Sequence, residues 1–287
     1  MSLYVLALVL AAAILHALWN LLAKRAQGKV PFTWLMYVAS NVIYLPAVVY
    51  ELKAGDNVYS ASLVWFSIGS AVLHLGYYSI LQKGYRNADL SVVYPLARGA
   101  GPLFASAAAI LLLHERLRLS STIGLLLIIG GVLIITGLSF RRENNRGIMT
   151  GIFYGVATGF FIALYTVNDA LAVKNYGVSP LTLTLVTNFF GAILLIPLVA
   201  GQKAELRREI REHKWSIVGI AVLSPAAYIL VLVALKYAPL TVVAPAREVS
   251  ILFGVFMGSR VLKEEDGKRR LAASLLILGG IVALSLG

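Results

Sequence analysis

Residues 90–99 read LSVVYPLARG, and residues 240–249 read LTVVAPAREV. The two stretches share Leu, Val, Val and Pro at the same places, and after a slip of one residue Arg98 matches Arg247. Each is an apolar run in which a proline is closely followed by an arginine. Two such runs, about 150 residues apart, indicate an internal repeat.

The likeness continues on both sides of these stretches. Trp65, Gly69, Ala71, Val72, Leu73 and Tyr78 match Trp215, Gly219, Ala221, Val222, Leu223 and Tyr228. Beyond the arginines, Leu103, Phe104, Glu115, Gly130 and Gly131 match Leu252, Phe253, Glu264, Gly279 and Gly280. We therefore predict two structural units, residues 1–140 and 147–287.

The composition places both units in a lipid bilayer. Residues of the AVILMFWYC class make up 59% of the 287 residues and charged residues only 13%, and the mean hydropathy is +0.83. A soluble protein cannot bury so much apolar surface. Because the chain has no cysteine, disulfides, thiol catalysis and thiolate metal sites are excluded.

Ten apolar stretches of about 20 residues follow one another, each long enough to cross a bilayer. They are residues 3–23, 31–50, 61–82, 90–113, 119–139, 147–172, 180–200, 215–235, 240–262 and 269–286. Lipid offers exposed backbone amides no partner, so an all-α polytopic membrane protein with ten transmembrane helices is expected. The first stretch lacks a basic leader and a cleavage site, and we expect it to be retained.

The number of spans sets the symmetry. Five spans per unit is an odd number, so the second unit must cross the membrane in the opposite sense to the first. The sequence thus predicts two inverted five-helix repeats. Transporters built in this way place the substrate near the pseudo-two-fold axis.

Basic residues predict the orientation. There are 25 Lys+Arg against 13 Asp+Glu, and eighteen of the 25 fall in the odd-numbered loops between spans, against five in the even-numbered loops. The positive-inside rule then puts both termini on the outer side of the inner membrane. The excess charge is an orientation signal and calls for no nucleic acid. Residues 201–214 are predicted to form a surface helix on lipid headgroups.

Charged side chains at membrane depth are functional candidates. Arg98, Arg247, His16 and His74 are each expected within several ångströms of the midplane, counting 1.5 Å per residue. Arginine binds a carboxylate or phosphate well, so Arg98 and Arg247 are predicted to bind the substrate or to gate the pathway through the protein. An internal ion pair with Glu248 is the alternative for Arg247.

The helices that carry the arginines are expected to be broken. The residues that favour a break are Pro95, Gly99, Gly101, Pro102 and Pro245. Prolines and glycines at matching places in two halves point to a transporter site.

Other polar and aromatic residues complete the predicted site. Candidate substrate contacts are Trp19, Asn20, Tyr78, Tyr94 and Tyr228, and Tyr77 belongs to the same aromatic group. His16 is the leading proton-coupling candidate, followed by His74 and Glu248. Asp169 is expected at the outer rim of its span, in contact with solvent. Two histidines without further ligands predict no metal site, and no cofactor is expected.

Small residues predict close helix packing. Gly151, Gly155 and Gly159 recur every fourth residue on one face. The pairs Gly130-Gly131 and Gly279-Gly280 are expected to act in the same way, with a homodimer contact through Gly-rich faces as a further hypothesis.

The chain resembles the EamA-type ten-helix transporters of the drug/metabolite transporter superfamily over essentially its whole length. The resemblance rests on His16-Ala17-Leu18-Trp19-Asn20 running to Lys24, on the two Pro-plus-Arg stretches, and on Glu115 and Glu264. It implies secondary transport of a small metabolite: some members export amino acids, and others move sugar phosphates, nucleotide sugars or amines. The related small multidrug transporters carry a glutamate eight residues before a lysine, where this chain has His16.

These features favour an exporter of a small polar metabolite, such as an amino acid or organic anion, working by alternating access with proton coupling. A transporter of amines or lipid-linked substrates is the second hypothesis, and a channel or a non-transporting scaffold would share the composition. An enzyme is not expected, because the sequence has no Gly-x-Ser-x-Gly, HExxH or Gly-x-Gly-Asp motif and no cysteine.

Overall fold

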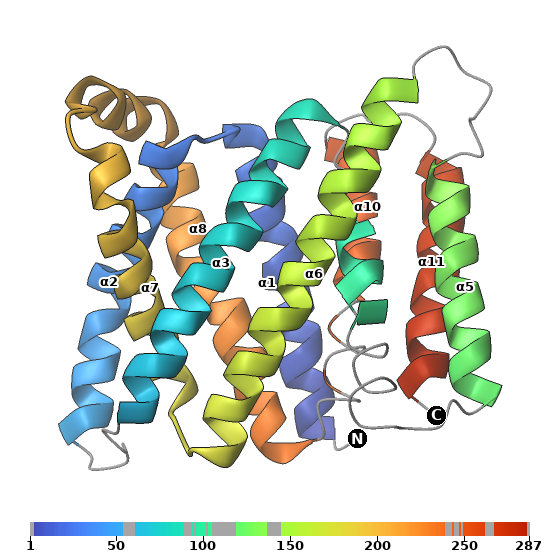
Figure 1. Ribbon diagram of the computed structural model, residues 1–287, viewed down its shortest axis with the longest axis horizontal. Coiled ribbons are helices and arrows are strands. Elements are labelled where there is room, and N and C mark those ends of the chain that lie inside the picture. The colour runs from blue at the N-terminus through green and yellow to red at the C-terminus, as the bar shows by residue number, and fades with distance from the viewer. Residues whose placement is uncertain are drawn as a thin grey trace.

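A computed structural model describes residues 3–53, 61–88, 93–94, 96–101, 103–104, 119–136, 145–238, 243, 247, 249–261 and 267–285. Its helices are α1 (Leu3–Ala26), α2 (Val30–Lys53), α3 (Ala61–Asn87), α5 (Leu119–Thr136), α6 (Asn145–Asn175), α7 (Pro180–Val199), α8 (Lys203–Tyr237), α10 (Ser250–Val261) and α11 (Gly267–Ser285). No strand occurs among these residues. The helices run side by side along one direction (Figure 1).

Six helices are long and apolar enough to cross a membrane. They are α1, α2, α3, α7, α8 and the part Met149–Asn175 of α6. Their outward faces carry large apolar side chains, such as Val42, Phe153 and Leu198, which are 58–67% exposed. An apolar outer surface on a helical bundle is typical of contact with lipid. The prediction of an all-helical polytopic membrane protein is confirmed at this level.

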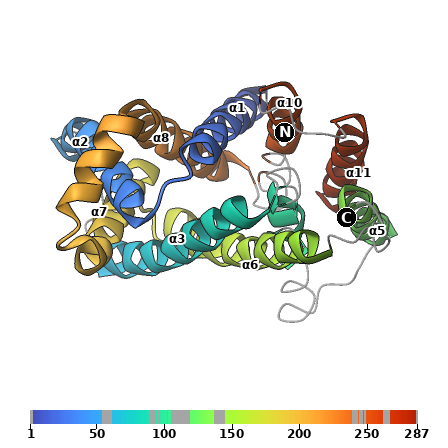
Figure 2. The ribbon, with the colours of Figure 1, turned by 90° about the horizontal axis from the view of Figure 1, so that it is seen from above.

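Helices from the two halves of the chain alternate in the bundle. Helix α1 packs along α8, and α6 packs along α3. Helix α2 contacts both α7 and α8, and α3 contacts α7. Helices α5 and α11 pack against each other at one edge, seen in both views (Figures 1 and 2), and α11 also contacts α10.

Small residues bring several of these helices close together. A Cβ on Gly159 of α6 would lie 2.9 Å from the carbonyl oxygen of Ala97, and one on Gly155 would lie 2.6 Å from Cβ of Leu96. In the α5–α11 pair, a Cβ on Gly131 would lie 2.7 Å from the carbonyl oxygen of Ala273. Side chains larger than hydrogen are excluded at these positions.

The contact between α5 and α11 bears on the expected homodimer. Gly280 of α11 approaches the backbone of α5, where its Cβ would meet the carbonyl oxygen of Gly124 at 2.6 Å. Gly131 and Gly280 therefore serve a contact within one chain. Gly130 and Gly279, by contrast, have nothing within 4 Å of an added Cβ.

Two apolar clusters fill opposite ends of the six-helix bundle. We call these ends the Tyr4 end, where α1 begins, and the Lys24 end, where α1 finishes. The cluster at the Tyr4 end includes Val5, Val9, Leu63, Leu183 and Leu235, and the cluster at the Lys24 end includes Trp19, Ala23, Phe32, Leu81 and Tyr85. Polar groups near the middle of the bundle lie between these two clusters.

Helix α8 contains the predicted surface helix as its first part. Residues 203–212 are helical, whereas His213 has φ −124° and ψ 15°, which is not helical. The chain changes direction there, and the first part lies across the Lys24 end (Figure 1). The apolar remainder of α8 then continues through the bundle.

Candidate functional site

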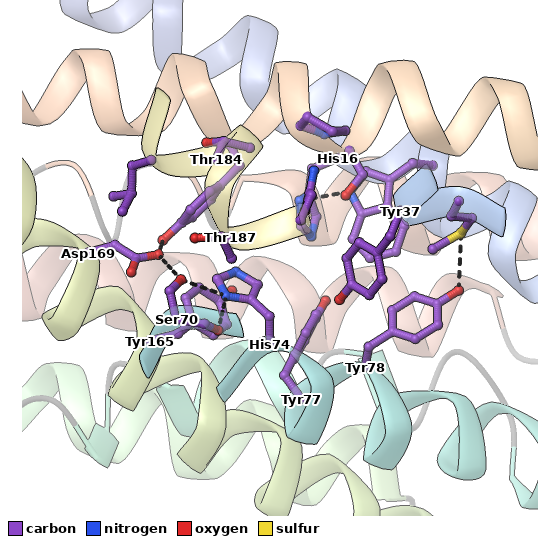
Figure 3. Close-up of a pocket in the computed structure, with 17 residues that line it drawn as sticks. His16, Tyr37, Ser70, His74, Tyr77, Tyr78, Tyr165, Asp169, Thr184 and Thr187 are labelled. Carbon is purple, nitrogen blue, oxygen red and sulfur yellow. Dashed lines mark hydrogen bonds between the residues drawn. The ribbon is translucent and has the colours of Figure 1, made fainter. Parts of the chain in front are cut away.

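A cavity of about 90 Å³ lies between the two apolar clusters. Six helices from both halves of the chain surround it (Figure 3). Its lining comprises His16 and Trp19 of α1, Met36 and Tyr37 of α2, Ser70, His74, Tyr77 and Tyr78 of α3, Tyr165 and Asp169 of α6, Leu183, Thr184, Thr187 and Asn188 of α7, and Ser224, Pro225 and Tyr228 of α8. The wall thus combines several aromatic rings with hydroxyl, amide, imidazole and carboxylate groups.

Asp169 is the carboxylate of this cavity. Its side chain is fully buried and accepts three hydrogen bonds: from the hydroxyls of Tyr228 at 2.7 Å and Ser70 at 2.9 Å, and from the amide of Asn168 at 2.8 Å. The expectation of a solvated rim residue is therefore wrong. Counting residues from the end of the span does not show which face of α6 a side chain occupies, and this face turns Asp169 inward, toward α3 and α8.

His74 lies beside Asp169 and extends the same polar group. Its Nδ1 is 3.1 Å from the Ser70 hydroxyl and 2.9 Å from the Ser70 carbonyl oxygen. Its ring stacks on Tyr165 at a centroid distance of 4.1 Å and meets the Tyr228 ring edge-on at 5.4 Å. We call Asp169, Ser70, His74 and Tyr228 the Asp169 group; Figure 3 labels the first three of these residues. This group can bind a positively charged part of a ligand, because its carboxylate lies among aromatic rings.

His16 is held on the opposite side of the cavity by its own helix. The indole N–H of Trp19 donates to its Nδ1 at 3.1 Å, so Nδ1 accepts and the ring proton sits on Nε2. Nε2 is buried and has no hydrogen-bond partner among the described residues. His16 therefore offers a ligand one ring N–H and would lose its bond to Trp19 on gaining a second proton.

The two arginines come together at a smaller, adjoining cavity of about 20 Å³. Arg98 and Arg247 are 3% and 7% exposed, and His16, Tyr165 and Tyr228 line both cavities. Arg247 donates to the Thr166 hydroxyl at 3.2 Å. Two guanidinium groups at one small cavity provide a place for an anionic group.

Tyr94 supports the arginine side without lining either of these cavities. The guanidinium carbon of Arg98 lies 5.6 Å from the centre of its ring, and its hydroxyl donates to Ser250 at 3.2 Å. Asn20 has a similar supporting position. It donates to the carbonyl oxygen of His16 at 2.8 Å and accepts from the Tyr85 hydroxyl at 3.0 Å.

Several predicted residues lie outside the part of the chain that the structure describes. These are Pro95, Pro102, Pro245 and Glu248. Gly99 and Gly101 are described, helical and buried, and a Cβ on Gly101 would lie 3.2 Å from Ile162 of α6. In the described ranges, no three His, Cys, Asp or Glu side chains gather to hold a metal ion.

Sequence reasoning missed Asp169 and Tyr165. The repeat contained a signal for Tyr165, because Ala17-Leu18-Trp19 in α1 has a counterpart, Ala163-Leu164-Tyr165, in α6. Both aromatic residues line the larger cavity. Asp169 follows Tyr165 by four residues, which places it on the same helix face.

Comparisons with known proteins agree with this architecture. The model of the EamA-like transporter family matches residues 3–137 and again residues 149–286. A crystal structure of another protein aligns with 99% of this chain and 97% of its own, with a TM-score of 0.65 and 15% identity. At that identity the likeness shows the fold alone.

Two shorter relatives match part of the sequence. The spermidine export protein MdtI of Yersinia enterocolitica serotype O:8 / biotype 1B is 36% identical over 72 residues, which is 25% of this chain and 66% of that protein. The spermidine export protein MdtI of Enterobacter sp. strain 638 is 37% identical over 71 residues, 25% of this chain and 65% of that protein. The chain spans just under two thirds of the length of these relatives.

Proposed function

This chain belongs to the EamA-like transporter family, and on that premise we propose that it exports a small polar metabolite by alternating access. It is a multi-pass inner-membrane protein. The proposal further assigns it ten transmembrane helices in two inverted five-helix repeats, residues 1–140 and 147–287, with both termini on the outer side. The Lys24 end of the bundle is then the cytoplasmic end.

Symmetric packing supports the inverted repeats. The contact of α1 with α8 has its counterpart in the contact of α6 with α3, and the contact of α2 with α8 has its counterpart in that of α7 with α3. The matched residues Trp65 and Trp215 are 72% and 77% exposed. One lies near the start of α3 and the other near the start of the apolar part of α8, where tryptophan is typical of the membrane interface.

The observation that carries the proposal is the cavity shared by the two halves. It lies in the middle of the bundle, and residues of α1, α2 and α3 face residues of α6, α7 and α8 across it. Rocking of one repeat against the other changes the access to such a cavity from each side of the membrane.

The charges favour a substrate that carries both an ammonium and an anionic group. The Asp169 group suits the ammonium, and Arg98 with Arg247 suits the carboxylate or phosphate. His16 lies between the Asp169 group and the two arginines and lines both cavities. An amino acid satisfies both ends with one molecule, whereas an organic anion alone leaves the buried Asp169 without a cationic partner from the substrate.

An amine is the second candidate, and a separate observation favours it. Asp169 lies among Tyr165, Tyr228 and the neighbouring ring of His74, an arrangement that binds organic cations. The partial relatives are named as spermidine exporters. In this candidate, Arg98 and Arg247 support the bundle and do not touch the substrate.

A thermal-shift screen of the full chain in detergent, followed by flux in proteoliposomes, tests these assignments. Amino acids, phosphorylated metabolites and polyamines are compared at equal concentration. The proposal expects a shift by a compound with both charges and saturable flux with counterflow. Stabilisation by amines alone would favour the second candidate, and flux without counterflow would identify a channel.

A further inference from the structure

The first part of α8, residues 203–213, is a polar segment, helical up to His213, that the first half of the chain does not match in sequence. We call it the α8 arm. It lies across the Lys24 end, along the edge of the bundle formed by α2 and α7 (Figures 1 and 2). The non-helical backbone at His213 separates it from the apolar part of α8.

One side of the arm is occupied by the protein itself. The His213 ring meets the Phe32 ring edge-on at 6.2 Å, and its Nε2 lies 3.9 Å from Oε2 of Glu209. Beside this contact, a cavity of about 430 Å³ separates Glu205, Glu209 and Arg208 from the connection between α1 and α2. The side of the arm that carries Glu209 and His213 therefore faces the bundle.

The other side of the arm is a stripe of basic residues. An α-helix turns by about 100° per residue, so Lys203, Arg207, Ile210 and Arg211 fall within an arc of about 100°. The three glutamates of the arm fall within an arc of about 60° on the opposite side. All four stripe residues are exposed, and Arg211 also approaches Glu212 at 3.7 Å. We call these four residues the basic stripe.

The height of the arm along the bundle is marked by the residues that follow it. Trp215 is 77% exposed, and the ammonium of Lys214 lies 5.4 Å from the centre of its ring. Exposed tryptophan next to lysine is typical of the level of lipid headgroups. The arm thus lies where headgroups of the adjacent leaflet can reach it.

We propose that the basic stripe docks on anionic lipid headgroups of the leaflet at the Lys24 end, with Ile210 in the boundary between headgroups and acyl chains. The stripe is complementary in charge to an anionic leaflet, and its isoleucine suits a surface that is part apolar. At its end, the arm also contacts Phe32, near the start of α2, through His213. This inference depends on neither the substrate nor the direction of transport.

Because the sequence has no cysteine, a single introduced cysteine is the one thiol available for labelling. A single Ala204→Cys substitution adds a labelling site on the arm, next to the stripe, for an environment-sensitive fluorophore. The labelled full chain is placed in nanodiscs of zwitterionic phosphatidylcholine, or of phosphatidylcholine with phosphatidylglycerol, both with brominated acyl chains that quench the label. Both leaflets of a disc are alike, so membrane orientation has no influence.

The expected result is stronger quenching in the anionic discs, lost at about 1 M salt, where the Debye length falls to about 3 Å. The double variant Arg207→Gln, Arg211→Gln should lose the difference between the two lipids. Arg208→Gln is the matched control, because Arg208 is also exposed but lies off the stripe and pairs with Glu212 at 3.0 Å. It should keep the difference.

Three results would overturn the proposal. Equal quenching in the two lipids would remove the role of lipid charge. An equal loss in the Arg208→Gln control would assign the effect to overall charge. Shielding of the label that appears only when two copies share a disc would make the stripe an interface between copies.

Discussion

The Asp169 group and the arginine pair occupy neighbouring parts of the same polar centre but carry opposite charge. Asp169 is fixed by three hydrogen bonds from α3, α6 and α8. Arg98, by contrast, packs over the Tyr94 ring, and Arg247 donates a hydrogen bond to the Thr166 hydroxyl. His16, Tyr165 and Tyr228 line both parts. Membrane depth and the repeat drew attention to the positive part. The negative part favours an amino acid over an organic anion, the two substrates expected from the sequence.

The largest expected effect comes from removing the negative charge. Asp169→Asn keeps the size of the side chain but removes the partner of a substrate ammonium. A hydrogen bond to a charged group contributes about 1.5–3 kcal/mol, so substrate affinity should fall by about 10- to 150-fold. Binding of a labelled substrate to the purified chain, with flux in proteoliposomes, measures the loss.

Glu51→Gln is the matched control for that experiment. Glu51 is also a carboxylate that accepts hydrogen bonds from hydroxyls, those of Ser179 and Thr182 at the start of α7, but it lies outside the cavity. Its substitution should leave affinity unchanged. If both variants lose affinity equally, the loss reflects helix packing, and the Asp169 group is not a binding site.

Removing either positive charge should have the next largest effect, and it should depend on the substrate. With a zwitterionic substrate, we expect Arg98→Gln and Arg247→Gln each to lower affinity by about tenfold, the equivalent of about 1.4 kcal/mol. With a polyamine, neither variant should change affinity. If every anionic and zwitterionic compound bound both variants as it binds the unmodified protein, the arginines would not bind substrate. The Asp169 group would then be the one binding part of the two.

How far the sequence predicts this centre depends on the information that each residue needs. Arg98 and Arg247 were predictable because a charge in an apolar stretch is conspicuous and the repeat presents it twice. Tyr78 and Tyr228 match each other in the same repeat, Trp19 was predicted as an aromatic residue close to the expected site, and all three line the larger cavity. The general fold followed from composition and span length alone.

Asp169 could not be placed in this way, because its role depends on which face of α6 it occupies and on what α3 and α8 bring to it. Ser70 and Tyr228 are far from it in the sequence, and only the packing of α6 against α3 and α8 brings their hydroxyls to its carboxylate. Asn20 and Tyr94 show the converse. Their depth was compatible with ligand contact, but the structure uses them to hold His16 and Arg98.

The two histidines allow the coupling of transport to protons to be assigned to one part or the other. His16 lines the arginine cavity, and His74 belongs to the Asp169 group. We expect His16→Gln to abolish the dependence of flux on a pH gradient while counterflow without a gradient continues, because glutamine does not change charge. Flux in proteoliposomes with and without an imposed gradient measures this.

His74→Gln serves as the comparison and should keep the gradient dependence. If His74→Gln loses it and His16→Gln keeps it, coupling belongs to the Asp169 group. Gradient-driven flux that is unchanged in both variants would show that neither histidine couples transport to protons.

The smallest expected difference concerns one hydroxyl on each part. Tyr228→Phe removes the 2.7 Å hydrogen bond to Asp169, and Tyr94→Phe removes the 3.2 Å hydrogen bond to Ser250 while keeping the ring under Arg98. The first bond has a charged acceptor and the second a neutral one, so Tyr228→Phe should lower substrate affinity severalfold, by about 1 kcal/mol, and Tyr94→Phe by less. Both variants keep the aromatic surface, which leaves the hydroxyl as the variable when binding is measured side by side. Equal losses of affinity in the two variants would mean that the charge of Asp169 does not strengthen the contribution of its hydrogen bond to binding. A larger loss in Tyr94→Phe than in Tyr228→Phe would place the principal substrate contact at the arginine pair.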